Sequence, residues 1–203
     1  MDIVLIALYL ACELTANVTA SKPVAVAGVV VPAGVFIYAL TFTLIDLINE
    51  RLGKARARQV VYGAFAGNIL LAAYSAFTVW LPPAAFYPHQ AAYATVLGST
   101  PRIVAASLLA YLVSALLDTE IFAWWRARVR GHRWARVLVS NTVSTFVDSV
   151  VFITGAFAGI LPLWPLIQGQ YLWKMIVTAV SLPLIYFVRA EWPGRQSVGT
   201  AGP

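Results

Sequence analysis

Ionisable and amide side chains recur at helical spacing inside apolar segments of this chain. Asp46, Asn49 and Glu50 stand at i, i+3 and i+4 just before the cationic stretch 51–58, so on a helix they share one face. Glu13 and Asn17, four residues apart, do the same. Such groups usually face a bundle interior or a wet cavity, because lipid does not solvate them. The pattern predicts a polar site; the alternatives are snorkelling into the headgroup region for the first group and an interhelical polar clamp for the second.

The second half of the chain also has polar residues at helical spacing inside apolar segments. Asp148 falls near the middle of an apolar segment, where a carboxylate costs about 2.5–3.5 kcal/mol to insert and should therefore face protein or water. Lys174 lies inside another such segment and follows Gln170 by four residues. It could form an ion pair with Asp148 or Glu13, or contact a substrate. Further polar residues share these faces: Tyr111, Ser114 and Asp118 on one segment, and Asn141, Ser144 and Thr145 beside Asp148.

Carboxylates and amides suit a small, flat, neutral or cationic ligand with N–H donors, because a carboxylate accepts paired N–H groups while an amide or ammonium donates to a carbonyl. An anionic sugar phosphate would fit badly. The chain has no Ser/His pair, HExxH helix or GxGD motif, so we do not expect an enzyme. The lone Cys12 and the distant His89 and His132 predict neither a disulfide nor a metal site, and no cofactor is expected.

The composition of the chain indicates that these segments lie in a membrane. The 203 residues are 61% hydrophobic and 11% charged, with a mean hydropathy of +0.80, whereas soluble domains are about 25% charged. Six segments reach the length of about 20 residues that a crossing needs. They are 3–20, 33–50, 60–81, 103–124, 138–161 and 167–188. We expect an all-α bundle of six transmembrane helices as one domain over 1–188, followed by a flexible cytoplasmic tail at 189–203.

Cations cluster in a way that orients the chain. Of fourteen Lys and Arg, four lie in 51–58, five in 126–136 and two after 188. This is the positive-inside pattern rather than a nucleic-acid surface, and it predicts cytoplasmic loops at 51–58 and 126–136 with both termini cytoplasmic. Residues 82–102, which are rich in proline and aromatics, are then an external loop with a short interfacial helix.

Two features bear on packing. The apolar run from 24 to 50 exceeds one straight crossing and contains Pro32 and Gly34, which predicts either a discontinuous helix beside a cavity or a kinked one. Gly63–Gly67 and Gly155–Gly159 both read GAFAG, a GxxxG pattern typical of close helix packing within a chain or in a homodimer.

Taken in order, several short motifs resemble one family across most of 10–188. They are Ala16-Asn17 with Lys22; Leu40-Thr41-Phe42 to Asp46, Asn49-Glu50 and Gly53; Thr100-Pro101-Arg102-Ile103, Ala106-Ser107 and Ala110-Tyr111; Asp118; Ser144 to Asp148, Phe152, Ala156-Phe157 and Gly159; and Tyr171, Lys174, Pro183 and Tyr186. The chain is similar to the queuosine precursor transporters, also called the vitamin uptake transporter family. Family members often carry Gln three residues before the fifth-span Asp, where this chain has Thr145.

The resemblance implies a multi-pass importer in the cell inner membrane that carries 7-deazaguanine precursors of queuosine, such as 7-cyano-7-deazaguanine and 7-aminomethyl-7-deazaguanine. We expect alternating access, with Glu13 or Asp148 as the candidate for any proton coupling. The alternative is a substrate-binding subunit of an energy-coupling-factor importer. The expected substrate-binding residues are Glu13, Asn17, Asp46, Tyr111, Asp118, Asn141, Thr145, Asp148, Tyr171 and Lys174, and the expected gating residues are Asn49, Glu50 and Arg51. Its partners would be the small deazapurine and the lipid bilayer, with no direct contact to nucleic acid.

Overall fold

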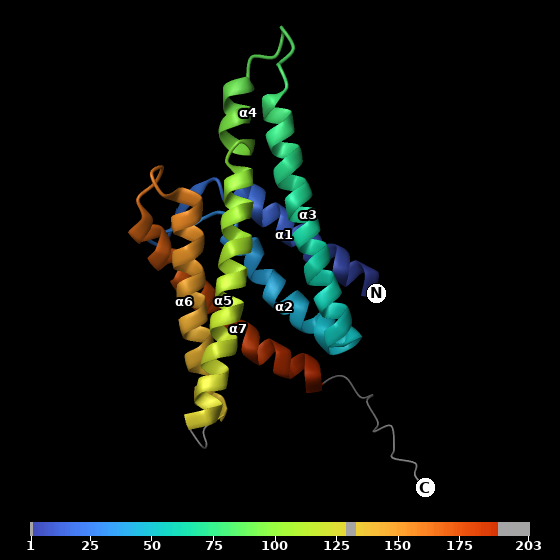
Figure 1. Ribbon diagram of the computed structural model, residues 1–203, viewed down its shortest axis with the longest axis vertical. Helices are drawn as coiled ribbons and strands as arrows, with labels where there is room; N and C mark the ends of the chain where they lie inside the picture. Colours follow the sequence, from blue (N-terminus) through green and yellow to red (C-terminus); the bar gives the residue numbers. More distant parts are fainter. Residues whose placement is uncertain (1, 129–132, 191–203) are drawn as a thin grey trace.

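The computed structural model describes residues 2–128 and 133–190, with side chains described except at 118–119, 122–128, 133–141 and 181–190. Its elements are α1 (Asp2–Thr19), β1 (Pro23–Val26), β2 (Val29–Pro32), α2 (Val35–Leu52), α3 (Lys54–Trp80), α4 (Gln90–Leu97), α5 (Thr100–Arg128), α6 (Arg133–Phe157) and α7 (Leu163–Ala190). Each predicted span thus corresponds to one long helix (Figure 1). Arg189 and Ala190 end α7, and the rest of the predicted tail lies outside the described residues.

Helix length and apolarity fit a membrane protein. Within the described residues, three segments are long and apolar enough to cross a bilayer: 2–19, 54–80 and 90–117. The helix α2 is also 18 residues long but carries Asp46, Glu50 and Arg51 near its end. The short α4 lies within 82–102, where a short helix was predicted. The predicted all-α class therefore describes the chain, apart from one segment.

That segment is 23–32, where the expected helical piece before Pro32 is wrong. Strands β1 and β2 pair antiparallel with Pro23 opposite Pro32 and Val26 opposite Val29. Ala27 and Gly28 make the two-residue turn, both with positive φ (51° and 80°), which is the geometry that closes a tight hairpin and that glycine adopts without strain. The run is rich in valine, whose branched side chain favours strands, and pairing satisfies its backbone groups. The chain is interrupted near Gly34, but by a β-hairpin.

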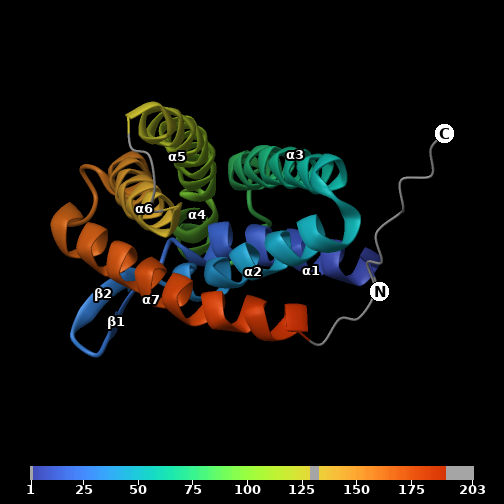
Figure 2. The ribbon, with the colours of Figure 1, turned by 90° about the horizontal axis from the view of Figure 1, so that it is seen from below.

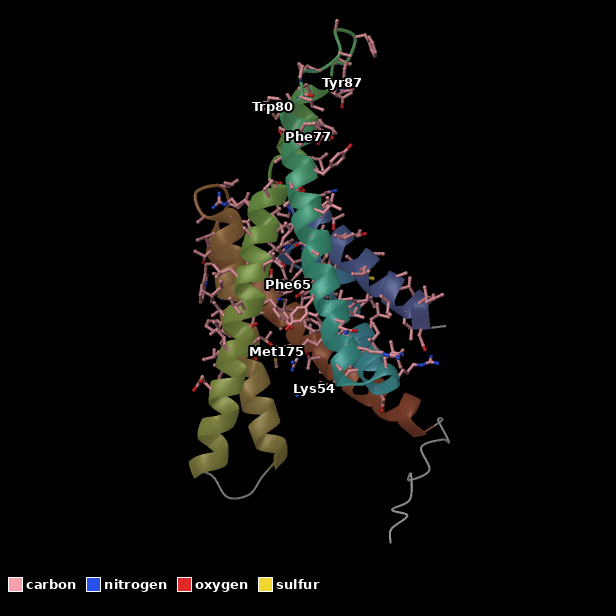
Figure 3. All side chains as sticks on the ribbon, turned by 45° about the vertical axis from the view of Figure 1, so that its right-hand side comes forward. Lys54, Phe65, Phe77, Trp80, Tyr87 and Met175 are labelled. Atoms are coloured by element: carbon pink, nitrogen blue, oxygen red, sulfur yellow. The ribbon has the colours of Figure 1, made fainter. Side chains whose placement is uncertain are left out.

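The connections gather at two ends of the molecule. In Figure 1 the α2–α3 junction and the adjoining ends of α5 and α6 lie toward the bottom, while the α3–α4 connection lies at the top. Figure 3 shows Phe77, Trp80 and Tyr87 near the upper end of α3 and Lys54 at the other end. All three aromatic side chains are exposed. Aromatic residues at one end of a helix and a cation at the other are typical of a membrane crossing.

Two hydrophobic clusters hold the helices together. One joins α5, α6 and α7 through Ile103, Ile153 and Leu166, and the other joins α1, α2 and α3 through Tyr9 and Ile48. Seen from below, α1 and α2 lie between α7 on one side and α3 on the other (Figure 2).

The two GxxxG patterns behave differently. A β-carbon at Gly155 would press on the Ala106 side chain, so α6 approaches α5 closely there. A β-carbon at Gly63 would meet nothing within 4 Å, and one at Gly67 would make only ordinary contact with Leu14. The pattern on α6 thus packs within the chain, and the homodimer stays a prediction.

The guanidinium of Arg102, on α5, strengthens the contact between α5 and α6. Its Nε donates to the carbonyl oxygen of Gly155 at 2.8 Å, and its Nη2 donates to that of Ala158 at 2.7 Å. These carbonyls belong to the end of α6, where a helix lacks internal donors and a cation is favourable. Arg102 therefore caps α6 from the neighbouring helix.

Candidate substrate-binding pocket

One pocket opens where five long helices and the hairpin meet. Its walls come from α1, β2, the start of α2, α5, α6 and α7. The lining residues are Ala16, Asn17, Ala20, Pro32, Gly34, Val35, Tyr38, Ser107, Ala110, Asp148, Phe152, Gln170 and Lys174. Apolar and aromatic walls with a few convergent polar groups are the usual composition of a small-molecule site.

An ion pair between α6 and α7 dominates the pocket's charge. The Lys174 ammonium donates to the Asp148 carboxylate, and the two side chains are only 6% and 15% exposed. The same ammonium lies 5.1 Å from the centre of the Tyr38 ring, within cation–π range. Of the partners that the sequence left open for Lys174, the structure thus shows Asp148.

Two buried amides line the other side of the polar region. Asn17, on α1, donates from Nδ2 to Oδ1 of Asn68 on α3 at 2.7 Å, and both side chains are buried. Gln170, one helical turn before Lys174, is also buried and lines the pocket. Asn68 is not among the lining residues, and its hydrogen bond to Asn17 connects it to the pocket.

Glu13 lies near the pocket without lining it. Its carboxylate lies close to the Tyr9 hydroxyl one turn earlier and within electrostatic range of Lys174. Glu13 and Tyr9 thus form a second polar cluster next to the ion pair.

Three more predicted binding residues lie apart from the pocket lining. Tyr111 packs edge-on against Phe65 with ring centres 5.1 Å apart, and Tyr171 packs likewise against Phe146 at 5.5 Å. Thr145 accepts at its carbonyl oxygen from the Ser149 hydroxyl at 2.9 Å. The side chains of Asp118 and Asn141 lie outside the described residues.

The face that carries Asp46, Asn49 and Glu50 is exposed at the far end of α2. None of the three lines the pocket. Arg51 pairs there with Asp2 at the start of α1, with Nε 3.4 Å from Oδ1. This pair joins the two helix ends next to the α2–α3 junction.

Among the polar and aromatic residues that line the pocket, four were absent from the predicted binding set: Tyr38, Ser107, Phe152 and Gln170. Ser107 and Phe152 belong to the motifs quoted for the family resemblance, and Gln170 shares a helix face with Lys174. Tyr38 had no distinguishing signal, because every predicted span contains at least one aromatic residue.

The pocket is small in this conformation. The space that the centre of a water molecule can reach is about 30 Å³, enough for one or two waters. A ring-shaped ligand would therefore require the surrounding helices or side chains to move apart. Within the described part of the chain, no three His, Cys, Asp or Glu side chains are grouped as metal ligands.

Comparison with known proteins identifies the family. The protein-family model described as "Putative vitamin uptake transporter" matches residues 32–188. A Bacillus subtilis (strain 168) protein named "Probable queuosine precursor transporter" is 31% identical over 186 residues, which covers 89% of this chain and 81% of that protein. No solved structure matches. With its long apolar helices, the chain is a multi-pass membrane protein and a transporter, and it belongs to the vitamin uptake transporter family.

Proposed function

We propose that this protein imports the queuosine precursors 7-cyano-7-deazaguanine and 7-aminomethyl-7-deazaguanine across the cell inner membrane by alternating access. The observation that carries the proposal is the pocket between the long helices, with the Asp148–Lys174 pair withdrawn from solvent inside it. The name of the Bacillus subtilis relative supports the choice of substrate.

The chemistry of the pocket suits such a ligand. A deazaguanine ring has N–H donors beside a carbonyl, which a carboxylate and an ammonium or amide can bind. Tyr38 and Phe152 offer aromatic faces for the ring. Because Asp148 and Lys174 are bonded to each other, an arriving ligand would compete with this pair, and the small pocket would have to open.

The proposed orientation puts both termini and the loops 51–58 and 126–136 in the cytoplasm. The start of α1 and the end of α7 both lie on the right-hand side of the molecule in Figures 1 and 2, which supports placing the two termini on one side of the membrane. Asn49, Glu50 and Arg51 would form a cytoplasmic gate, with the Arg51–Asp2 pair as one of its contacts.

Uptake of labelled 7-cyano-7-deazaguanine tests the proposal in cells that lack both their own importer and any energy-coupling-factor ATPase. The wild-type chain should support uptake there. Asp148→Asn should abolish it while the protein still reaches the membrane, and Glu120→Gln, which changes an exposed carboxylate outside the pocket, should not.

The outcomes separate the alternatives. Uptake by the wild type only after the ATPase is supplied would favour a substrate-binding subunit. Normal uptake by Asp148→Asn would remove Asp148 from the site. No uptake and no binding of any deazapurine would overturn the proposed substrate.

A further inference from the structure

The side chain of Gln170 has no hydrogen-bond partner within the described residues, although only 3% of the residue is exposed and it lines the pocket. A side-chain amide carries two N–H donors and a carbonyl acceptor. The amide is not fully enclosed by protein but borders the space of the pocket, where water or a ligand can bind it. The position is therefore suited to a ligand that offers both an acceptor and a donor.

Unlike the amide of Gln170, the amide of Asn17 already has a hydrogen-bond partner, Asn68. Its Nδ2 donates to Oδ1 of Asn68, with the residues 4% and 2% exposed. This bond fixes the rotation of the Asn17 amide and commits its nitrogen to α3. The oxygen of Asn17 is the atom that remains to accept from a ligand in the pocket.

The ion pair of Asp148 and Lys174 makes the neutral amides the more accessible partners for a ligand. The Asp148 carboxylate is already bonded to Lys174, so neutral groups are the polar atoms in the pocket that a ligand can bind without first separating charges. Gln170 and Asn17 come from α7 and α1, which both line the pocket.

We propose that Gln170 and Asn17 recognise the hydrogen-bonding edge of the ligand, and that Asn68 is a positioning residue that holds the acceptor oxygen of Asn17 toward it. The ligand class is a flat ring with a lactam, an N–H next to a C=O, and an adjacent amino group. Gln170 binds the lactam with two parallel hydrogen bonds, and Asn17 accepts from the amino group. Asp148 and Lys174 then serve the remaining polar groups. This inference rests on the proposed function and assigns its specificity to particular residues.

Binding to the purified full chain in detergent tests the inference without transport. Titration calorimetry would use 7-cyano-7-deazaguanine, the analogue without the 2-amino group, and the 7-cyano-7-deazaadenine that reverses the donor and acceptor of the lactam. The wild type should reject the adenine analogue by about 100-fold or more, because its amides would be left unpaired. It should bind the analogue without the amino group about 10-fold more weakly.

Matched variants assign each contact. Gln170→Met keeps the length of the side chain and should lose about 10-fold or more in affinity, together with the discrimination between lactam and adenine analogue. Asn68→Leu should remove the preference for the 2-amino group. Asn68→Asp, which keeps an acceptor oxygen for Nδ2 of Asn17, should retain that preference. A purely structural role for Asn68 would weaken all three ligands equally.

The failures are distinguishable. If the wild type binds none of the deazapurines, the proposed function is overturned. If the wild type binds 7-cyano-7-deazaguanine but Gln170→Met keeps the affinity and the discrimination, the role of Gln170 is overturned while the function stands. Should Gln170→Met not be recovered folded, Gln170→Leu also removes both the donors and the acceptor, and it should show the same loss for the lactam.

Discussion

Lys174 on α7 and Asp148 on α6 form an ion pair in the pocket, with most of both side chains withdrawn from solvent. Two charges in such a place stabilise each other and cost free energy when separated. The pair therefore links the stability of the protein to the proposed binding site.

Removing one partner should destabilise the protein more than removing both. Asp148→Asn leaves Lys174 buried without its carboxylate, at a cost on the order of 3 kcal/mol. The double variant Asp148→Asn with Lys174→Met should recover most of this loss, because no uncompensated charge remains. Thermal unfolding in detergent measures both. Equal stability of Asp148→Asn and the wild type would contradict this account, and the double variant should still fail in uptake.

Arg102 should contribute to stability through the end of α6. Its two hydrogen bonds to the carbonyls of Gly155 and Ala158 are charge-assisted but solvent-exposed, so Arg102→Gln should cost about 1 kcal/mol. Arg102→Lys should recover only part of this stability, because a lysine ammonium does not reproduce the planar arrangement of the guanidinium N–H groups. Thermal unfolding checks this, with Arg58→Gln as a control for the loss of one exposed cation. The same melting temperature for Arg102→Gln and the control would refute the cap.

A β-carbon at Gly169 on α7 would collide with the carbonyl oxygen of Val30 in the hairpin. Gly169→Ala should therefore push β2 away from α7 and lower stability by about 1–3 kcal/mol. The matched control is Gly63→Ala, where the added methyl group meets open space and should be neutral or slightly stabilising in the helix. Similar effects of the two variants on thermal unfolding would argue against close contact between hairpin and α7.

The proposed cytoplasmic gate predicts a separation between transport and binding. Glu50→Gln and Arg51→Gln should slow uptake several-fold, because they change contacts at the end of α2. Neither residue lines the pocket, so affinity for the ligand in detergent should be unchanged. Lys54→Gln is the neighbouring control, exposed at the start of α3. Uptake by Glu50→Gln at the wild-type rate would contradict the gate and indicate that the end of α2 serves only to anchor the chain at the membrane surface.

The long helices were predictable because apolar length alone sets a membrane crossing. The hairpin at 23–32 was not, since the apolar run from Val24 to Val31 suits a helix and a strand equally when only hydrophobicity is counted. Its alternating valines and the Ala27-Gly28 pair were the available signals. Their weight depends on the packing of β2 against α7, which is a tertiary contact.

Charged residues of the candidate site were predictable from the sequence because charges are rare inside apolar segments. Neutral residues were not, because their prediction requires knowing which face of each helix points toward the pocket. Asp148 and Lys174 stand out inside apolar segments, and the structure brings them together. Tyr171 lies next to Gln170 in sequence, yet a step of one residue turns about 100° around the helix. Tyr171 therefore packs on Phe146 while Gln170 lines the pocket. Which face points inward depends on how each helix is rotated in the bundle, and spacing within one helix does not contain that information.

The clamp between α5 and α6 limits how the molecule can change shape. Arg102 and the close approach of Gly155 to Ala106 bind these two helices to each other near one end. Helix α7 meets α6 across the pocket, and there the connection passes through Lys174 and Asp148. A motion that opens the pocket would therefore carry α5 and α6 together, and α7 would move relative to them while Leu166 holds its start against this pair of helices. The Lys174–Asp148 ion pair would then be the polar contact between α6 and α7 that separates when the pocket opens.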